Sequence, residues 1–263
     1  MKKTKKGYCP IGLTAFAMDS TNATWDDFRA LNQSQAYKEL RLQTIADQGG
    51  LCAYCEVHYL DKPETVSIEH FHPKSDLSNP IKNWALDWHN LHAVCRGGRD
   101  KNADGQQPYP TPENLSCDAY KDYLVSKNKL TEHCEGKLFN PLLMPEIKIF
   151  KFNKSTGALE VDELTCKQIA ETELQTSADL IELAKETLRI LNLNCQRLRD
   201  ARLEVLKAYN QYIKKAREQN NQKIHQQLAH RWFSAPWPSY FTTRRDLLGQ
   251  AAEHYLQKIA YSG

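Results

Sequence analysis

The stretch "SIEHFHPKSD", residues 67–76, carries the residues on which the interpretation of the chain depends. Glu69 stands directly before His70, His72 follows, and Pro73 ends the run. An acid and two imidazoles can be buried together only when something pairs with them, and the two suitable partners are a metal ion and a phosphate. The sequence on either side has to decide between these partners.

Size and composition indicate a globular protein with basic residues gathered in two places. At 263 residues, the chain can form one large or two modest domains with a buried core. The hydrophobic content of 41% and the charged content of 25% argue against wholesale disorder. The net charge is only +3, but basic residues cluster in the opening "MKKTKK" and in residues 197–217. Such clusters suit a phosphate backbone, although the second also fits the solvated face of a helix.

The sequence predicts a cytoplasmic protein without a membrane span. The apolar run "IGLTAFAMD" after the basic start is interrupted by Gly12 and Thr14, and it is too short for a secretory leader. No window approaches the length of a transmembrane helix. In a reducing cytoplasm, the eight cysteines indicate metal binding or catalysis more than disulfides.

Patterning divides the chain into three segments. Residues 1–50 hold the basic start and a predicted helix over residues 34–48, which ends at a Gly-Gly pair. Residues 51–135 are rich in Cys, His, Trp and Gly and form the predicted metal-bound unit, with a long Pro- and Gly-rich loop after Cys95. Residues 136–263 begin with a predicted β-hairpin and continue as helices, which we assign to docking a partner or a substrate.

The last segment contains one hairpin and two helices whose limits can be predicted. Alternation in "IKIFKF" (147–152) and in "ALEV" (158–161) predicts two strands around the turn "NKSTG". Apolar residues at three- and four-residue steps over residues 198–216 predict one long amphipathic helix. A single final helix is expected from residue 242 to about residue 260.

The cysteine spacing predicts a structural zinc site. Cys52 and Cys55 have the two-residue gap that lets two thiolates of a tight knuckle reach one tetrahedral ion. Cys95 is the next cysteine, and Cys117 is the best candidate for the fourth ligand. The reserves for that position are His133 and Cys134. Four thiolates leave no open coordination site for water, so catalysis must occur elsewhere. The remaining cysteines lack such spacing and are expected to be core residues: Cys9, Cys166 and Cys195.

The order of these motifs resembles the HNH nuclease superfamily. Cys55 is followed by "IEH", "WALDWHNL", Cys95 and "CDAYK". In that superfamily, a ββα-metal fold carries a general-base His at the end of a first strand, an Asn on a second strand and a metal ligand at the start of the next helix. The resemblance assigns these positions to His70, Asn90 and Asp118.

Seven segments, taken together, point to one family within this superfamily. Together, "LCAYCE", "IEHFHPKS", "NWALDWHNL", "VCRGG", "SCDAYK", "LFNPL" and "LNLNCQRLRDARL" resemble the PtuB family, the HNH component of Septu anti-phage systems that is also found with some retrons. The resemblance implies a PtuA-like ATPase as a partner, and in a retron a reverse transcriptase with its msDNA. The composition of the chain by itself shows no such partner.

The residues at these positions suit phosphodiester hydrolysis. A neutral imidazole at His70 can accept a proton from water, and an amide at Asn90 can orient it through the nearby backbone. Glu69 and Asp118 offer the hard oxygens that Mg²⁺ or Mn²⁺ prefers. Glu69 could also act indirectly, with His72 or water as the ligand. Asn102 is an alternative to Asp118 as the metal ligand. The residues expected to contact the phosphates of the substrate are Lys74, Lys121 and His72.

The sequence therefore predicts an α+β protein with a zinc-stapled ββα-metal (HNH) core, a small β-hairpin and a mostly α-helical C-terminal region. The expected activity is metal-dependent cleavage of DNA, or of structured RNA such as tRNA, in an anti-phage system with an ATPase partner. Two alternatives remain open: a freestanding HNH restriction or homing-type nuclease, and a zinc-stapled module that binds nucleic acid without cutting it.

Overall fold

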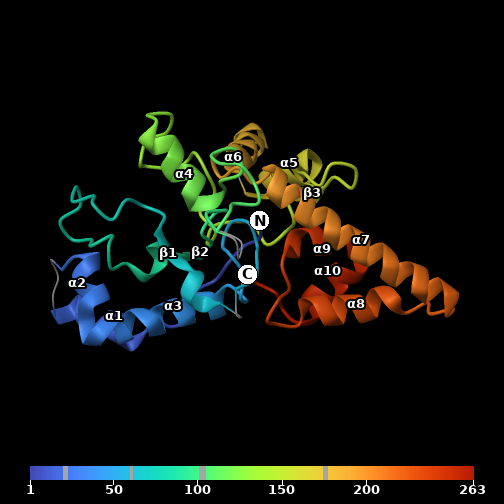
Figure 1. Cartoon of the computed structure of the whole chain (residues 1–263), viewed down its shortest axis with the longest axis horizontal. Helices are drawn as coiled ribbons and strands as arrows, with labels where there is room; N and C mark the ends of the chain where they lie inside the picture. Colours follow the sequence, from blue (N-terminus) through green and yellow to red (C-terminus); the bar gives the residue numbers. More distant parts are fainter. Residues whose placement is uncertain (20–22, 60–61, 101–104, 174–176) are drawn as a thin grey trace.

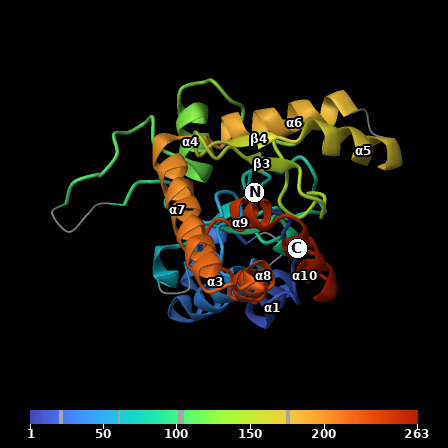
Figure 2. The same ribbon diagram turned by 90° about the vertical axis from the view of Figure 1, so that its right-hand side faces the viewer.

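The computed structural model describes residues 1–19, 23–59, 62–100, 105–173 and 177–263. Figure 1 shows an elongated molecule in which the N-terminal helices and the C-terminal helices occupy opposite ends. Both termini lie near the middle (Figures 1 and 2). The Tyr261 hydroxyl donates to the carbonyl of Lys3 at 3.4 Å. None of the helices in the described ranges has the length and apolarity needed to cross a membrane.

The N-terminal end consists of three short helices that cover one side of the central sheet. They are α1 (Ile11–Asp19), α2 (Trp25–Ala30) and α3 (Gln35–Asp47), with the 3-10 turn η1 (Leu31–Ser34) between the last two. Thr24 and Asp27 form a capping box that fixes the start of α2. The helix predicted over residues 34–48 is α3, as expected. Leu40 on its apolar face belongs to the same hydrophobic cluster as Leu91 of β2. We call this group the N-terminal cluster.

The middle of the molecule contains two strands followed by a helix, the order that the resemblance implied. Strands β1 (Ser67–His70) and β2 (Leu91–Val94) pair antiparallel, and α4 (Cys117–Ser126) follows. Register places Glu69 opposite His92 and His70 opposite Leu91. Two 3-10 turns, η2 (Pro63–Thr65) and η3 (Trp88–Asn90), precede the strands.

The second half begins with the predicted hairpin and continues as helices. The hairpin consists of β3 (Phe150–Phe152) and β4 (Leu159–Val161), which pair antiparallel. Three helices follow: α5 (Glu163–Glu173), α6 (Ser177–Ile190) and α7 (Gln196–Glu218). The predicted long helix is α7. Side chains from the hairpin, these helices and the four-cysteine region share one hydrophobic core, the central cluster, which includes Phe150 and Leu198.

The final helix predicted from residue 242 to about residue 260 is wrong in one respect, because the structure divides it in two. After α8 (Ile224–Phe233), helix α9 (Phe241–Leu248) ends and α10 (Gln250–Lys258) begins at Gly249. Gly249 has φ 50° and ψ −125°, a conformation that favours glycine and ends the helical hydrogen bonding. The turn lets α8, α9 and α10 pack on one another and on Leu51 in a C-terminal cluster.

Candidate active site and metal centre

Four thiols meet in the middle of the molecule. The sulfur atoms of Cys52, Cys55, Cys95 and Cys117 all lie within 4.8 Å of one another. Neighbouring Sγ–Sγ distances are 3.8 Å for Cys52–Cys117 and 3.6 Å for both Cys55–Cys95 and Cys95–Cys117. Four thiolates at about 2.3 Å from a tetrahedral zinc ion would be about 3.8 Å apart. The arrangement therefore fits a four-thiolate zinc site, with the fourth cysteine that the sequence favoured.

Local backbone geometry explains why these thiols converge. The amide of Cys52 donates to the carbonyl of Val57 at 2.9 Å, which closes the knuckle. After Cys95, Gly97 has φ 64°, and a Cβ there would lie 2.4 Å from the carbonyl oxygen of Ser116. Only glycine lets this turn approach the start of α4 so closely. Cys117 has φ 57°, a left-handed conformation for a residue with a side chain, so its surroundings must hold it in place.

The first turn of α4 brings the two predicted acidic ligands to the same point. Asp118 and Lys121 lie three residues apart on one face of the helix, and the Lys121 ammonium forms ion pairs with Asp118 at 3.4 Å and with Glu69 of β1. Glu69 and Lys121 are both buried. Lys121 was predicted to contact phosphate, and in this structure its ammonium is paired with these carboxylates instead.

The electrostatics of this group favour a cation between the two carboxylates. Burial, with an added effect of the neighbouring Asp122 charge, raises the pKa of Asp118 to about 7. Burial also lowers the pKa of Lys121. Atom Oδ1 of Asp118 is buried, and among the residues that the structure describes it forms an ion pair with Lys121 but no hydrogen bond. A donor set of hard oxygens with unsatisfied capacity fits Mg²⁺ or Mn²⁺, which would bring two charges where Lys121 brings one.

His70 lies at the end of β1, and its ring is held by groups outside the carboxylate pair. Its Nε2 is 3.1 Å from the carbonyl oxygen of Ala85, and the edge of Trp25 in α2 contacts the ring at 4.6 Å between centroids. A carbonyl can only accept, so Nε2 carries the proton and Nδ1 keeps its lone pair. Burial lowers the pKa of His70 to about 4, against a smaller raising effect of the Ala85 carbonyl.

Asn90 holds the loop that follows His70. Its Oδ1 accepts from the backbone amide of His72 at 2.7 Å. Its Nδ2 donates to the carbonyls of His72 and Trp84, both at 2.9 Å. Because Trp84 directly precedes Ala85, this one amide connects the end of β1 with the segment whose carbonyl orients His70. Asn90 was expected to hydrogen-bond the backbone near His70, and these contacts are of that kind.

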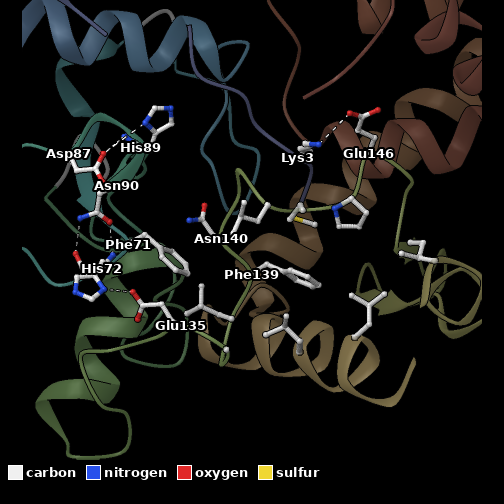
Figure 3. A pocket seen from close by; sticks show the side chains of 18 of the residues that line it. Lys3, Phe71, His72, Asp87, His89, Asn90, Glu135, Phe139, Asn140 and Glu146 are labelled. Atoms are coloured by element: carbon white, nitrogen blue, oxygen red, sulfur yellow. Dashed lines mark hydrogen bonds and ion pairs between the residues drawn. The ribbon is translucent and has the colours of Figure 1, made fainter. Parts of the chain in front are cut away.

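His72 lies at one end of a cavity of about 770 Å³ that extends toward the C-terminal half. Figure 3 shows the side chains of His72, Asn90 and Glu135 together at this end, with Phe139 and Asn140 farther along. The ring of His72 stacks on Trp84 at 3.8 Å between centroids. Lys74, two residues on, is exposed, as a phosphate contact requires.

The structure thus arranges the predicted site residues in two groups. Glu69, Asp118 and Lys121 form one group at α4, while Asn90 and His72 form the other around the loop after β1. In the sequence, His70 lies between Glu69 of the first group and His72 of the second. Among the described residues, no hydrogen bond or ion pair joins His70 to the α4 group. The alternative ligand Asn102 lies outside the described residues.

Sequence reasoning missed several partners of these residues. The Ala85 carbonyl, the Trp25 ring and the Asp76 and Glu135 carboxylates were not identified. The first two contacts depend on tertiary packing and carry no sequence signal. The spacing of His72 and Asp76, four residues apart in a polar turn, was a signal that could have been used.

Comparison with known proteins shows one strong similarity. No model of a known protein family matches the chain. The chain is 37% identical over 252 residues to a protein of Escherichia coli named "Retron Ec83 putative HNH endonuclease". The aligned part covers 94% of this chain and 93% of that protein, so the similarity spans nearly the whole length of both.

Proposed function

The chain belongs to the HNH endonuclease family, and on that premise we propose that it is a metal-dependent endonuclease that hydrolyses phosphodiester bonds in nucleic acid. The observation that carries the proposal is the state of His70. Its ring is neutral at cellular pH, its Nε2–H is bound to a backbone carbonyl, and its Nδ1 is available as a proton acceptor at the end of β1.

The proposed mechanism assigns each residue a task at the end of β1. Nδ1 of His70 accepts the proton of the attacking water, while Ala85 and Asn90 keep the ring and the loop in position. In this mechanism the phosphate binds at the end of β1, next to His70. Lys74, which is exposed beside this position, contacts the neighbouring phosphates as a point charge.

The metal ligands proposed for catalysis are Glu69 and Asp118. When bound there, Mg²⁺ or Mn²⁺ supplies positive charge that stabilises the negative charge developing on the phosphate and the leaving oxygen. Lys121 occupies the space between the two carboxylates in this structure and has to move aside for the ion. The four thiols are proposed to hold a structural Zn²⁺ ion that fixes α4 against the strands.

We further propose a role in anti-phage defence in the cytoplasm. The similarity to a retron protein supports a retron setting, with a reverse transcriptase and its msDNA as components. A PtuA-like ATPase of the Septu type is the proposed partner, with the C-terminal helices α7 to α10 as its docking region. The substrate is DNA, or a structured RNA such as tRNA, since the proposed chemistry acts on the same bond in each.

A cleavage assay with His70→Ala tests the activity. Removal of the proton acceptor is expected to lower the cleavage rate by at least about 100-fold with Mn²⁺ and DNA or RNA pools as substrates. The zinc content and the melting temperature report whether the fold survives. The matched control is His89→Ala, which removes an exposed imidazole from the same region and should keep full activity. Cleavage at the wild-type rate in His70→Ala would show that the base is another group.

A further inference from the structure

A second group of metal-type donors lies outside both the thiols and the α4 carboxylates. One ligand atom from each of His72, Asp76 and His133 lies within 4.8 Å of the others. The first two residues belong to the turn after β1, and His133 belongs to the segment after α4. Because residues far apart in the sequence supply the donors, helical or turn spacing alone does not bring them together.

The donors are held in position by their surroundings. Stacking on Trp84 fixes the plane of the His72 ring at 26° to the indole, and Asn90 binds both the amide and the carbonyl of His72. The other oxygen of Asp76 accepts from the amide of Ser78 at 2.8 Å. The side chains of His72 and Asp76 are only 13% and 15% exposed, so little competing water reaches them. Such preorganisation is what a binding site requires.

The contacts of His72 follow the pattern of a metal-bound imidazole. Its Nε2 lies 2.7 Å from Oδ2 of Asp76, and the ring of His133 lies 5.2 Å from the His72 ring between centroids. Its Nδ1 contacts the carboxylate of Glu135 (Figure 3). Imidazoles that bind metals usually donate their other ring N–H to a carboxylate, which fixes the tautomer and raises the basicity of the ligating nitrogen. Here Nε2 would be the ligating atom and Glu135 its supporting carboxylate.

From this geometry we propose that His72, Asp76 and His133 form a second Zn²⁺ site, supported by Glu135. Two imidazoles and one carboxylate suit Zn²⁺ better than Mg²⁺, which prefers oxygen ligands only. Ligand atoms at about 2.1 Å from a tetrahedral ion are about 3.4 Å apart, so the present group needs only small side-chain movements. Three protein ligands leave a fourth position for water. The site does not depend on the proposed nuclease activity.

Counting zinc in the full chain tests this site. After loading with Zn²⁺ and desalting, the wild-type protein is expected to hold about two ions per chain, one at the thiols and one at His72. His133→Ala removes an exposed ligand and should lower the count to about one. The control His89→Ala removes an exposed imidazole from the rim of the same cavity and should leave the count unchanged. A wild-type count of about one, or no change in His133→Ala, overturns the proposal.

X-ray absorption at the zinc edge gives a second readout that does not depend on the total count. Wild-type protein should show sulfur ligands at about 2.3 Å together with nitrogen or oxygen ligands at about 2.0 Å, and His133→Ala should show sulfur alone. Sulfur alone in the wild type would mean that Asp76 and Glu135 only form hydrogen bonds with the His72 ring, and the site would be excluded.

Discussion

A single ammonium on α4 balances the buried carboxylate of Glu69 and the partly buried carboxylate of Asp118. Lys121 contacts both Glu69 and Asp118, and its own side chain is only 11% exposed. Burying the ions of such a group is costly, but removal of one partner is more costly still, because the other charges stay buried without compensation. Without a metal ion, the ammonium of Lys121 therefore supplies the positive charge that stabilises the two carboxylates.

Lys121→Met should destabilise the protein and make its stability depend on divalent ions. We expect the free energy of unfolding to fall by about 3 kcal/mol in buffer without Mg²⁺ or Mn²⁺. Added Mn²⁺ should recover more stability in the variant than in the wild type, because it binds carboxylates that Lys121 no longer occupies. Urea unfolding at several Mn²⁺ concentrations measures both effects. Lys129→Met, an exposed lysine just after α4, is the control and should respond like the wild type.

How well the sequence predicts a residue's environment depends on whether local or tertiary contacts decide it. The thiol group could be predicted because a Cys-x-x-Cys knuckle and the need for four ligands restrict the choice, and the structure brings those thiols together. The pairing of Lys121 could not be predicted, since an exposed lysine and a buried one look alike in a sequence. The same holds for His70, whose contacts with Ala85 and Trp25 come from segments distant in the chain.

At the scale of elements, the β1–β2 pair carries a histidine on each strand, one fully and one partly buried. His92 lies in β2, where all four residues are buried, and neither of its ring nitrogens has a hydrogen-bond partner within the described parts of the chain. Burial, with added effects of the Lys6 and His70 charges, holds the pKa of His92 well below its usual value. His70 at the end of β1 has its pKa lowered to about 4 for the same main reason. Both rings are therefore neutral in the folded state at neutral pH.

His92→Phe should make the protein less sensitive to acid. A histidine whose folded-state pKa is lowered contributes stability that is present above about pH 6.5 and is lost as pH falls toward the folded-state value. Within that window, each such group removes up to about 1.4 kcal/mol per pH unit. The variant lacks one of the two groups, so its free energy of unfolding should fall less steeply between about pH 6.5 and pH 5. Urea unfolding across this range measures the slopes, and equal slopes would contradict the prediction.

Element boundaries show a further limit of sequence reasoning. Helices α3 and α7 and the β3–β4 hairpin could be predicted because their apolar residues repeat with a clear period. The period continues across the end of α9 into α10, which is why one helix was expected there. The break depends on the dihedral angles of Gly249, and an isolated glycine in a helical pattern does not reveal whether the chain turns.

At the scale of the molecule, the cysteine knuckle joins the two ends. Glu56, next to Cys55, accepts hydrogen bonds from the amide and hydroxyl of Thr242 in α9, at 2.9 and 2.6 Å. The carbonyl of Glu56 accepts from the amide of Tyr240, and the carbonyl of Gly49 accepts from the amide of Trp237. The C-terminal helices are therefore attached directly to the knuckle, and a disturbance of the thiols is transmitted to them.

Cys117→Ser should weaken the whole protein in a single transition. Loss of one of four thiolates should lower zinc affinity, and a site of this type contributes on the order of 10 kcal/mol of apparent folding free energy. We expect bound zinc and the melting temperature to fall together, with both halves unfolding in the same step. Zinc analysis and calorimetry measure these quantities. Cys9→Ser, which changes a half-buried thiol outside the group, is the control, and a comparable loss there would contradict the proposed site.

Cys117 and Asp118 are consecutive residues, so the proposed structural ligand and the proposed catalytic ligand share one peptide bond. An α-helix advances about 100° per residue, so inserting one residue between them would rotate the carboxylate to another side of α4 while the four thiols stayed together. Such a chain would keep every side chain and its sulfur-bound ion, yet its carboxylate would no longer face Glu69. The spacing of these two positions therefore sets the angular alignment of the acid, independently of the chemistry of either residue.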